Sequence, residues 1–292
     1  MVAKLLSILL IIPTIYAKIN IDVTAAGENK RDVRILGSIV NVISKTEQNT
    51  FGLTDEKLKQ SVSKYFGLVP DNVYLHSPTP WGDLYKTMNW EPIRRVVVPQ
   101  KAAVLSIKSE PVLVARKEFM NEDAVPKTLK TEIREYVTNA VSSKWDTEGK
   151  LDVEDIMYEL DMKTDPTFTS FSSKWGQDSD KYTPMTVGSE IELTLAPNQK
   201  AVAELYVTKE EMMIRVDYET SLRGTVAINF DKEYRGHKFW SVDVNTLLTV
   251  GGLRKMVHSS EIIEYVQFID AKVVVKDPET EVVIKTLPLK LW

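Results

Sequence analysis

The strongest constraint on the fold is a period-two alternation of apolar and polar residues between Val187 and Trp240. In its first part Ile191, Leu193 and Leu195 share one face, and polar residues separate them. Successive residues of a strand point to opposite faces, so this pattern predicts strands with one buried face. The alternation continues through residues 200–230. The sequence therefore predicts a core of antiparallel β-sheet.

A turn signal at Ala196–Gln199 interrupts this alternation. Pro197 cannot donate a hydrogen bond to a ladder, and Asn198 tolerates the conformations of tight turns. We expect the strands on either side to pair as a β-hairpin. A second turn signal, Asp277–Thr280, predicts a closing hairpin near the C-terminus.

The first 17 residues have the pattern of a cleaved secretory signal, with Lys4, an apolar run from Leu5 to Ile15, and Ala17. The alternative is a membrane anchor, but the run is shorter than the roughly 20 apolar residues that span a bilayer. We therefore expect a secreted, extracellular protein.

Charge and composition exclude several function classes. The chain has 41 acidic and 37 basic residues and no long basic run, so nothing indicates nucleic-acid binding or attraction to anionic lipid. It has no cysteine, and its histidines (His76, His237 and His258) are far apart, so no metal site is expected. No nucleophile elbow or phosphate-binding glycine motif is present. We expect no enzyme activity and no cofactor.

Residues 18–121 contain both helix and strand patterns, which together predict a small α+β lobe. A cap at Thr54, helical spacing from Leu58 to Phe66, and Gly67 predict one helix. Strand-like runs surround it, and frequent prolines between them favour short strands and edges.

Within this lobe, Trp81, Tyr85 and Trp90 lie among turn-forming residues. Aromatic side chains on a loop stack on sugar rings or lie at the level of lipid headgroups. These three residues are therefore candidates for a glycan or lipid contact. The alternative is that they cover a small core.

Residues 121–182 are rich in serine and threonine, and their spacing fits both helix and strand. Strand alternation places Ile156, Tyr158, Leu160 and Met162 on one face, but it slips in phase against Leu151.

Several stretches together resemble the insect spherulin-2A-like proteins, which include yolk proteins of the follicular epithelium. They are LAPNQKAVAELYV, MMIRVDYETSLRGTVAINF, YRGHKFW, GGL and EPVLVARKEFMN. That family belongs to the aerolysin and epsilon-toxin class of β pore-forming proteins. The resemblance implies a mainly β, elongated, antiparallel aerolysin-like architecture. Together with the residue patterns above, it favours three parts: residues 1–17 as signal, residues 18–121 as the N-terminal lobe, and residues 122–292 as the β body.

The same resemblance implies an insertion tongue near residues 150–166. In that class the tongue leaves the body and closes, in a ring of protomers, into a transmembrane barrel. Ile156, Tyr158, Leu160 and Met162 would form part of its lipid-facing side. Six carboxylates in and around the tongue depart from this pattern: Asp152, Glu154, Asp155, Glu159, Asp161 and Asp165. The alternative is a segment that only packs on the body.

The leading hypothesis is a secreted, non-enzymatic protein that self-associates and contacts membranes or extracellular surfaces, with pore formation implied by the resemblance. Its partners would be further copies of itself and a membrane lipid or glycan receptor. The alternative is a yolk, eggshell or storage protein that uses the same fold without forming pores.

Overall fold

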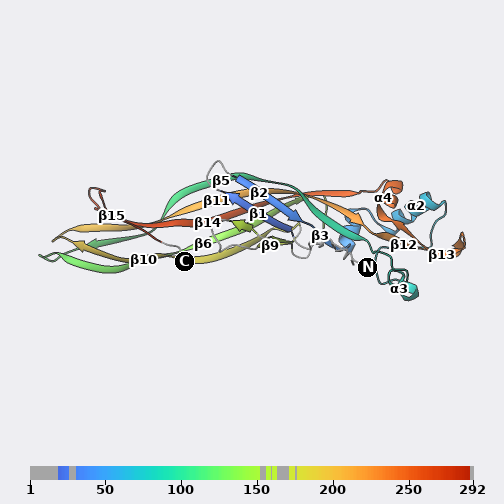
Figure 1. Ribbon diagram of the computed structural model, residues 1–292, viewed down its shortest axis with the longest axis horizontal. Helices are drawn as coiled ribbons and strands as arrows, with labels where there is room; N and C mark the ends of the chain where they lie inside the picture. Colours follow the sequence, from blue (N-terminus) through green and yellow to red (C-terminus); the bar gives the residue numbers. More distant parts are fainter. Residues whose placement is uncertain are drawn as a thin grey trace, which may run out of the picture.

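One antiparallel sheet runs along most of the length of the elongated molecule in the computed structural model (Figure 1). The structure describes residues 19–25, 31–151, 156–158, 160–162, 171–174 and 176–289. Within them the strand order is β10–β6–β14–β11–β5–β3, and β15 also pairs with β14. The strands are β3 (Ile39–Val42), β5 (Arg94–Met120), β6 (Lys127–Thr147), β10 (Ser179–Leu195), β11 (Lys200–Arg223), β14 (Met256–Lys276) and β15 (Val283–Pro288).

Strand β11 lies in the middle of this sheet and pairs with β14 on one side and β5 on the other. Its alternation has the predicted phase: Val216 and Tyr218 are buried, and Arg215 is exposed. The predicted antiparallel core is confirmed. The closing hairpin is confirmed too, since β14 and β15 pair across the turn that begins at Asp277.

The predicted hairpin around Ala196–Gln199 is wrong. All 17 residues of β10 pair with β6, and both edges of β11 pair with other strands. The turn therefore carries the chain between two layers, β6–β10 and β5–β11–β14. Their facing apolar residues form a separate core at this end of the molecule, here called the tail. Asn121 holds this turn, because its amide nitrogen donates to the carbonyl oxygens of Leu195 (3.1 Å) and Ala196 (3.0 Å).

The prediction of short strands between frequent prolines is wrong for residues 95–116, since β5 is one continuous strand of 27 residues. Its pairing with β11 shifts register at three places, one of them next to Pro99. In the described residues β3 pairs with β5 only from Arg94 to Val97, so beyond that point β5 is an edge strand. An edge strand tolerates proline because one side needs no ladder donors.

A second layer covers the middle of the long sheet (Figure 1). It contains β1 (Ile19–Ala25), β2 (Arg31–Gly37), β7 (Ile156–Tyr158), β8 (Leu160–Met162) and β9 (Phe171–Ser173). β1 pairs antiparallel with β2 and parallel with β8, and β7 pairs with β9. Ile19 and Ile21 of β1 and Phe171 of β9 belong to the same buried core as Ile214 and Val216 of the long sheet.

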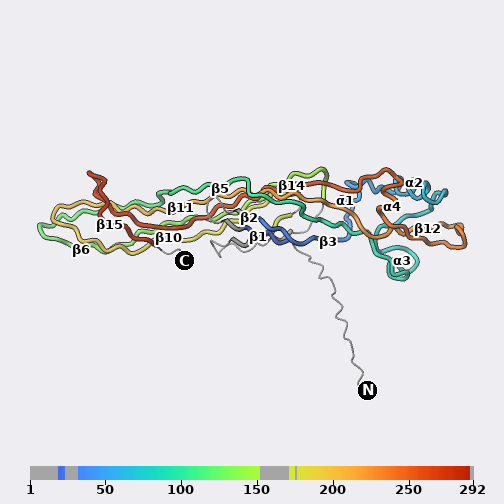
Figure 2. The backbone as a smooth tube through the Cα atoms, turned by 45° about the horizontal axis from the view of Figure 1, so that its top comes forward, coloured from blue at the N-terminus to red at the C-terminus, as the bar shows by residue number. Residues whose placement is uncertain are grey.

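The head lies at the other end of the long axis from the tail (Figure 2). It contains β4 (Asn72–Tyr74), β12 (Thr225–Tyr234), β13 (His237–Asp243), α1 (Lys45–Thr50), α2 (Asp55–Phe66), α3 (Pro80–Thr87) and α4 (Val244–Gly251). The strands form a small sheet with β12 in the middle.

Helix α2 confirms the predicted helix and its ends. The Thr54 side chain accepts a hydrogen bond from the backbone of Lys57, and Gly67 ends the helix with φ 78°. The head gathers segments from both sides of residue 121, because β12, β13 and α4 pack with α1–α3. The division of the chain at residue 121 stays a prediction.

Candidate functional site

The aromatic residues singled out in the sequence lie together on the head but play different parts. Trp81 is 47% exposed, and its ring lies against Phe239 (centroids 4.9 Å apart) and Tyr74 (6.2 Å). Trp90 is half-buried and packs on the same cluster as Tyr85. Trp81 is thus the most exposed of the three. Sequence reasoning missed Phe239, because no local pattern indicates a contact between segments so far apart in the chain.

Tyr85 is a buried support, only 4% exposed. Its hydroxyl lies 2.7 Å from the carbonyl oxygen of Tyr74 and 3.0 Å from that of Thr225, and it accepts from the backbone N–H of Ala227. Burial raises the pKa of the Tyr85 phenol well above its usual range, although the hydrogen bond from Ala227 opposes the shift. The phenol therefore stays protonated and holds the loop on the sheet.

The backbone that carries Trp81 is strained. Trp81, Gly82 and Asp83 all have left-handed φ values of 62°, 74° and 70°. A non-glycine residue in this region costs about 1–2 kcal/mol, and such strain persists only where its surroundings enforce it. The Asp83 carboxylate is buried and accepts from the Ser77 hydroxyl at 2.9 Å, which fixes the turn.

The predicted tongue falls between β6 and β10. Of its candidate lipid-facing residues, Ile156 and Tyr158 belong to β7, and Leu160 and Met162 belong to β8. Their side chains lie outside the described part of the structure, so the predicted apolar face stays a prediction. Two short ladders of three residue pairs each, β7–β9 and β1–β8, join these strands to others.

A buried polar cluster joins β9 to the long sheet. The Ser143 hydroxyl lies 3.3 Å from that of Ser173 and donates to Glu261 at 2.5 Å. The indole N–H of Trp145 donates to Ser173 at 3.0 Å, and the hydroxyl of Tyr218 donates to Glu261 at 2.9 Å. Burial strengthens such bonds and makes their loss costly, so the cluster fixes β9 in place. Sequence reasoning missed it because its members are separated by up to 118 residues.

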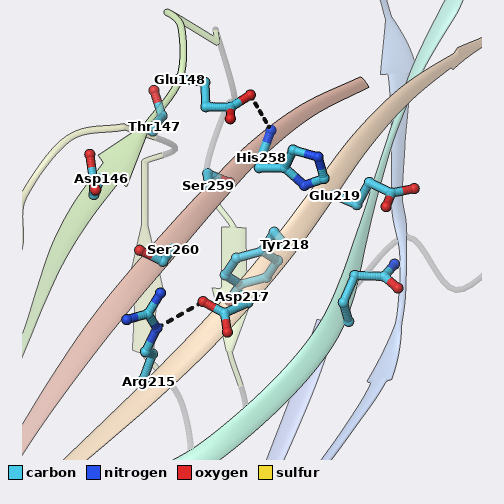
Figure 3. A pocket seen from close by; sticks show the side chains of 11 residues that line it. Asp146, Thr147, Glu148, Arg215, Asp217, Tyr218, Glu219, His258, Ser259 and Ser260 are labelled. Atoms are coloured by element: carbon cyan, nitrogen blue, oxygen red, sulfur yellow. Dashed lines mark hydrogen bonds and ion pairs between the residues drawn. The ribbon is translucent and has the colours of Figure 1, made fainter. Parts of the chain in front are cut away.

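A polar hollow of about 630 Å³ opens on the long sheet (Figure 3). It is lined by Gln100, Asp146, Thr147, Glu148, Arg215, Asp217, Tyr218, Glu219, His258, Ser259 and Ser260. Arg215 pairs with Asp217 at 2.8 Å, and Glu148 accepts from the backbone N–H of His258 at 3.2 Å (Figure 3).

This hollow shows no catalytic arrangement. In the described part of the chain the His258 ring forms no hydrogen bond to either serine, so a nucleophile–base pair is missing. No group of three or more His, Asp or Glu residues among those described is placed to hold a metal ion. Nor does any described helix combine the length and apolar character needed to cross a membrane.

Comparisons with known proteins identify relatives along nearly the whole chain. No protein-family model matches it. U-megalopygitoxin(8)-Mc8 of Megalopyge crispata is 30% identical over 269 residues, which cover 90% of this chain and 94% of the relative. U-megalopygitoxin(8)-Mo12 of Megalopyge opercularis has the same identity and the same coverage.

Among solved structures, parasporin-2, a Bacillus thuringiensis toxin that recognizes cancer cells, matches with a TM-score of 0.61. The match covers 86% of this chain and 100% of parasporin-2 at 15% identity, and at that identity it shows the fold alone. It confirms the predicted elongated, antiparallel, aerolysin-like architecture. The narrower resemblance to spherulin-2A-like yolk proteins stays a prediction.

Proposed function

The chain belongs to the U-megalopygitoxin(8) family, and from this premise we propose that it is a secreted, non-enzymatic toxin that self-associates on membranes and forms pores. The names of its relatives and the aerolysin-like fold support the toxin part of this proposal. The arrangement of β6 and β10 supports the pore.

The central observation is that β6 and β10 form one long ladder, and that the residues connecting them at one end, here called the excursion (residues 148–178), leave this ladder. They pair from Lys127–Leu195 to Ser143–Ser179, and the 31 residues from 148 to 178 connect them at the head-facing end of that ladder. A membrane-crossing β-strand needs about 9 to 11 residues, so the excursion is long enough for two crossing strands and a turn. Extending it would simply lengthen a hairpin that already exists.

In the described residues, the ladders that hold the excursion to the body are short. Its ladders contain three residue pairs each, whereas the β6–β10 ladder contains 17. Among the described residues it is also anchored by the buried side chains of Leu151 and Phe171 and by the polar cluster at Ser173. Near its two ends, Glu148, Lys150 and Asp178 accept hydrogen bonds from His258, Thr50 and Trp145 of the body. Segments with few buried contacts open at a lower free energy than the core. The excursion can therefore separate while the long sheet stays intact.

Self-association has a structural basis in the two edges of the long sheet. In the described residues, no strand pairs with β10 on the side away from β6, or with β5 beyond Val97. Unpaired edges are templates for pairing with another chain. Because the two edges differ, pairing β5 of one copy with β10 of the next is head-to-tail and closes into a ring if the rotation allows it.

Surface contact is assigned to the aromatic site on the head. Trp81 offers an exposed ring that contacts Phe239 and Tyr74. Phe239 and Tyr74 in turn pack on the same cluster as Tyr85 and Trp90. Such a ring suits the stacking of a sugar or insertion at headgroup level.

Dye release from liposomes tests this function. The mature protein from Lys18, with and without limited proteolysis, is expected to release dye and to form a large, ring-sized species in light scattering. A folded, stable protein that releases no dye under any lipid or protease condition would contradict the proposal and favour the storage role. The Trp81→Ala protein is expected to release dye more slowly because it docks more weakly.

A further inference from the structure

The far end of the head, here called the distal tip, consists of residues 64–71 and 231–238. The first segment ends α2, and the second is the turn of the β12–β13 hairpin, at the extreme end of the long axis (Figures 1 and 2). Two hydrogen bonds join them. The Tyr234 hydroxyl donates to the carbonyl oxygen of Phe66 at 3.0 Å, and the backbone N–H of Asp231 donates to the Asp71 carboxylate at 2.6 Å.

The distal tip exposes apolar side chains in one short stretch. Tyr65 is 50% exposed, Leu68 44% and Val69 62%. Gly67, with φ 78°, ends α2 and turns the chain so that Leu68 and Val69 follow outside the helix. Single exposed apolar residues need no explanation, but three within five positions at the end of an elongated molecule indicate a contact surface.

Aromatic rings beneath this stretch make it rigid. The ring of Phe66 contacts those of Tyr65 (5.0 Å), Tyr234 (5.5 Å) and Trp240 (5.5 Å), in each case edge to face. Trp240 and Phe239 are neighbours on β13, so they face opposite sides of the small sheet. The distal tip is therefore a different surface from the Trp81 site, which contacts Phe239.

The two segments of the distal tip also carry four cations. Lys64, Lys232, Arg235 and Lys238 are exposed, and none of the four forms an ion pair within the described part of the chain. The Arg235 guanidinium lies 5.1 Å from the centre of the Tyr234 ring. The tight turn Arg235–Gly236 has φ values of 51° and 82°, as two-residue hairpin loops require.

The same segments contain three carboxylates, but two of them already accept hydrogen bonds. Asp71 accepts from the backbone of Asp231, and Asp231 accepts from the Asn229 amide at 2.9 Å. Glu233 is the third. The four cations thus outnumber the carboxylates at this end of a chain whose net charge is −4. Local charge is opposite in sign to that of the whole protein.

We propose that the distal tip docks on a lipid bilayer that carries anionic headgroups. Exposed apolar side chains rimmed by lysine and arginine bind at the level of the headgroups, where the apolar groups leave water and the cations meet phosphate and carboxylate groups. Tyr65, Leu68 and Val69 enter the interface, and Arg235 and Lys238 contact the headgroups. The molecule then stands with its long axis raised from the membrane.

Vesicle sedimentation tests this proposal separately from pore formation, because binding is measured and leakage is not. The full mature protein is mixed with phosphatidylcholine vesicles that contain or lack phosphatidylserine. Binding is expected to be tighter with phosphatidylserine and to weaken as salt is added. The Arg235→Gln, Lys238→Gln double variant is expected to lose roughly fivefold in affinity for each cation removed.

Two matched controls separate the tip from the rest of the surface. The Lys101→Gln, Lys272→Gln double variant removes two exposed lysines of the long sheet that form no ion pair among the described residues. It makes the same change in net charge and is expected to bind like the wild type. The Leu68→Ser, Val69→Ser variant is expected to lose about tenfold, because less apolar area leaves water. Its control, Leu105→Ser, changes an exposed leucine of β5 and is expected to change nothing.

Any of three results would overturn the proposal, and the first two come from vesicle binding. One is equal binding to vesicles with and without phosphatidylserine. The other is an equal loss in the tip and control variants. Binding to soluble heparin without binding to vesicles would also overturn it, because it would assign the cations to a sulfated glycan. If the tip variants lose vesicle binding but the wild type never leaks dye, the docking surface stands and pore formation fails.

Discussion

Replacing Arg95 by methionine is expected to destabilise the fold strongly, because it leaves a buried carboxylate without its counter-charge. The Arg95 Nε lies 2.8 Å from Glu47 Oε1, and both side chains are only 1% exposed. Glu47 Oε2 also accepts from the backbone N–H of Ser44, which completes the N-terminal cap of α1. The ion pair therefore joins α1 of the head to the first residues of β5.

The size of the effect follows from this burial. Removing one partner of a buried ion pair costs about 3–5 kcal/mol, since the remaining charge stays in a medium that cannot solvate it. For a protein of this size, 1 kcal/mol lowers the midpoint of thermal unfolding by about 2–4 °C, so a fall of roughly 6–20 °C is expected. Thermal and urea unfolding followed by circular dichroism at pH 7 measure it.

The neighbouring arginine is the control. Arg94 lies 3.9 Å from Glu91, with side chains 37% and 49% exposed. The Arg94→Met change is expected to cost at most about 1 kcal/mol, because water screens such pairs. The Glu47→Gln, Arg95→Met double variant is expected to recover part of the loss, since no buried charge is left. If Arg95→Met costs no more than Arg94→Met, the reasoning is refuted.

Two further changes test local features of the fold. Gly224 joins β11 to β12 with φ 107°, and an added Cβ would lie 2.3 Å from the carbonyl oxygen of Pro92, so Gly224→Ala is expected to lower the urea midpoint clearly. Burial raises the pKa of the Glu204 carboxyl, but the hydrogen bonds from Tyr206 and Lys276 lower it by more than burial raises it. The pKa of Glu204 is therefore below its usual range. This carboxylate therefore adds stability above its unfolded pKa of about 4.3 that is lost as the pH falls through the folded pKa. The urea midpoints of wild type and Glu204→Gln should differ at pH 7 and converge in acid; a gap that persists at the lowest pH would contradict the assignment.

Features set by neighbouring residues could be predicted from the sequence. Helix α2 depends on Thr54 and Gly67 at its own ends, and the buried face of β11 follows from its own alternation. The partner with which each strand pairs is determined by residues distant in the sequence. β10 and β11 show the same alternation, and no pattern within β10 indicates that it pairs with β6 instead of β11.

The candidate sites show the same limit. Trp81 and Tyr85 are aromatic residues four positions apart, yet one is exposed and the other buried, because Thr225 and Ala227 from a distant strand bind the Tyr85 hydroxyl. The cations of the distal tip were hidden for a similar reason. The net charge of −4 describes the whole chain and does not reveal a local excess of cations. The two segments that carry these cations lie about 160 positions apart in the chain and come together only in the fold.

The most direct test of the pore is to fix the excursion to the sheet reversibly. The hydroxyls of Ser143 and Ser173 lie 3.3 Å apart, and the chain has no cysteine, so Ser143→Cys with Ser173→Cys allows a single disulfide between β6 and β9. As a control, Thr128→Cys with Thr194→Cys joins β6 to β10 where the hydroxyls lie 2.9 Å apart and no opening is expected.

Dye release from liposomes is then compared in the oxidised and reduced forms of each variant. The oxidised Ser143–Ser173 variant is expected to bind vesicles but to release no dye. Reduction is expected to restore release, and the control variant is expected to release dye in both forms. Equal release by the oxidised and reduced forms of the Ser143–Ser173 variant would contradict the claim that residues 148–178 leave the body to form the pore.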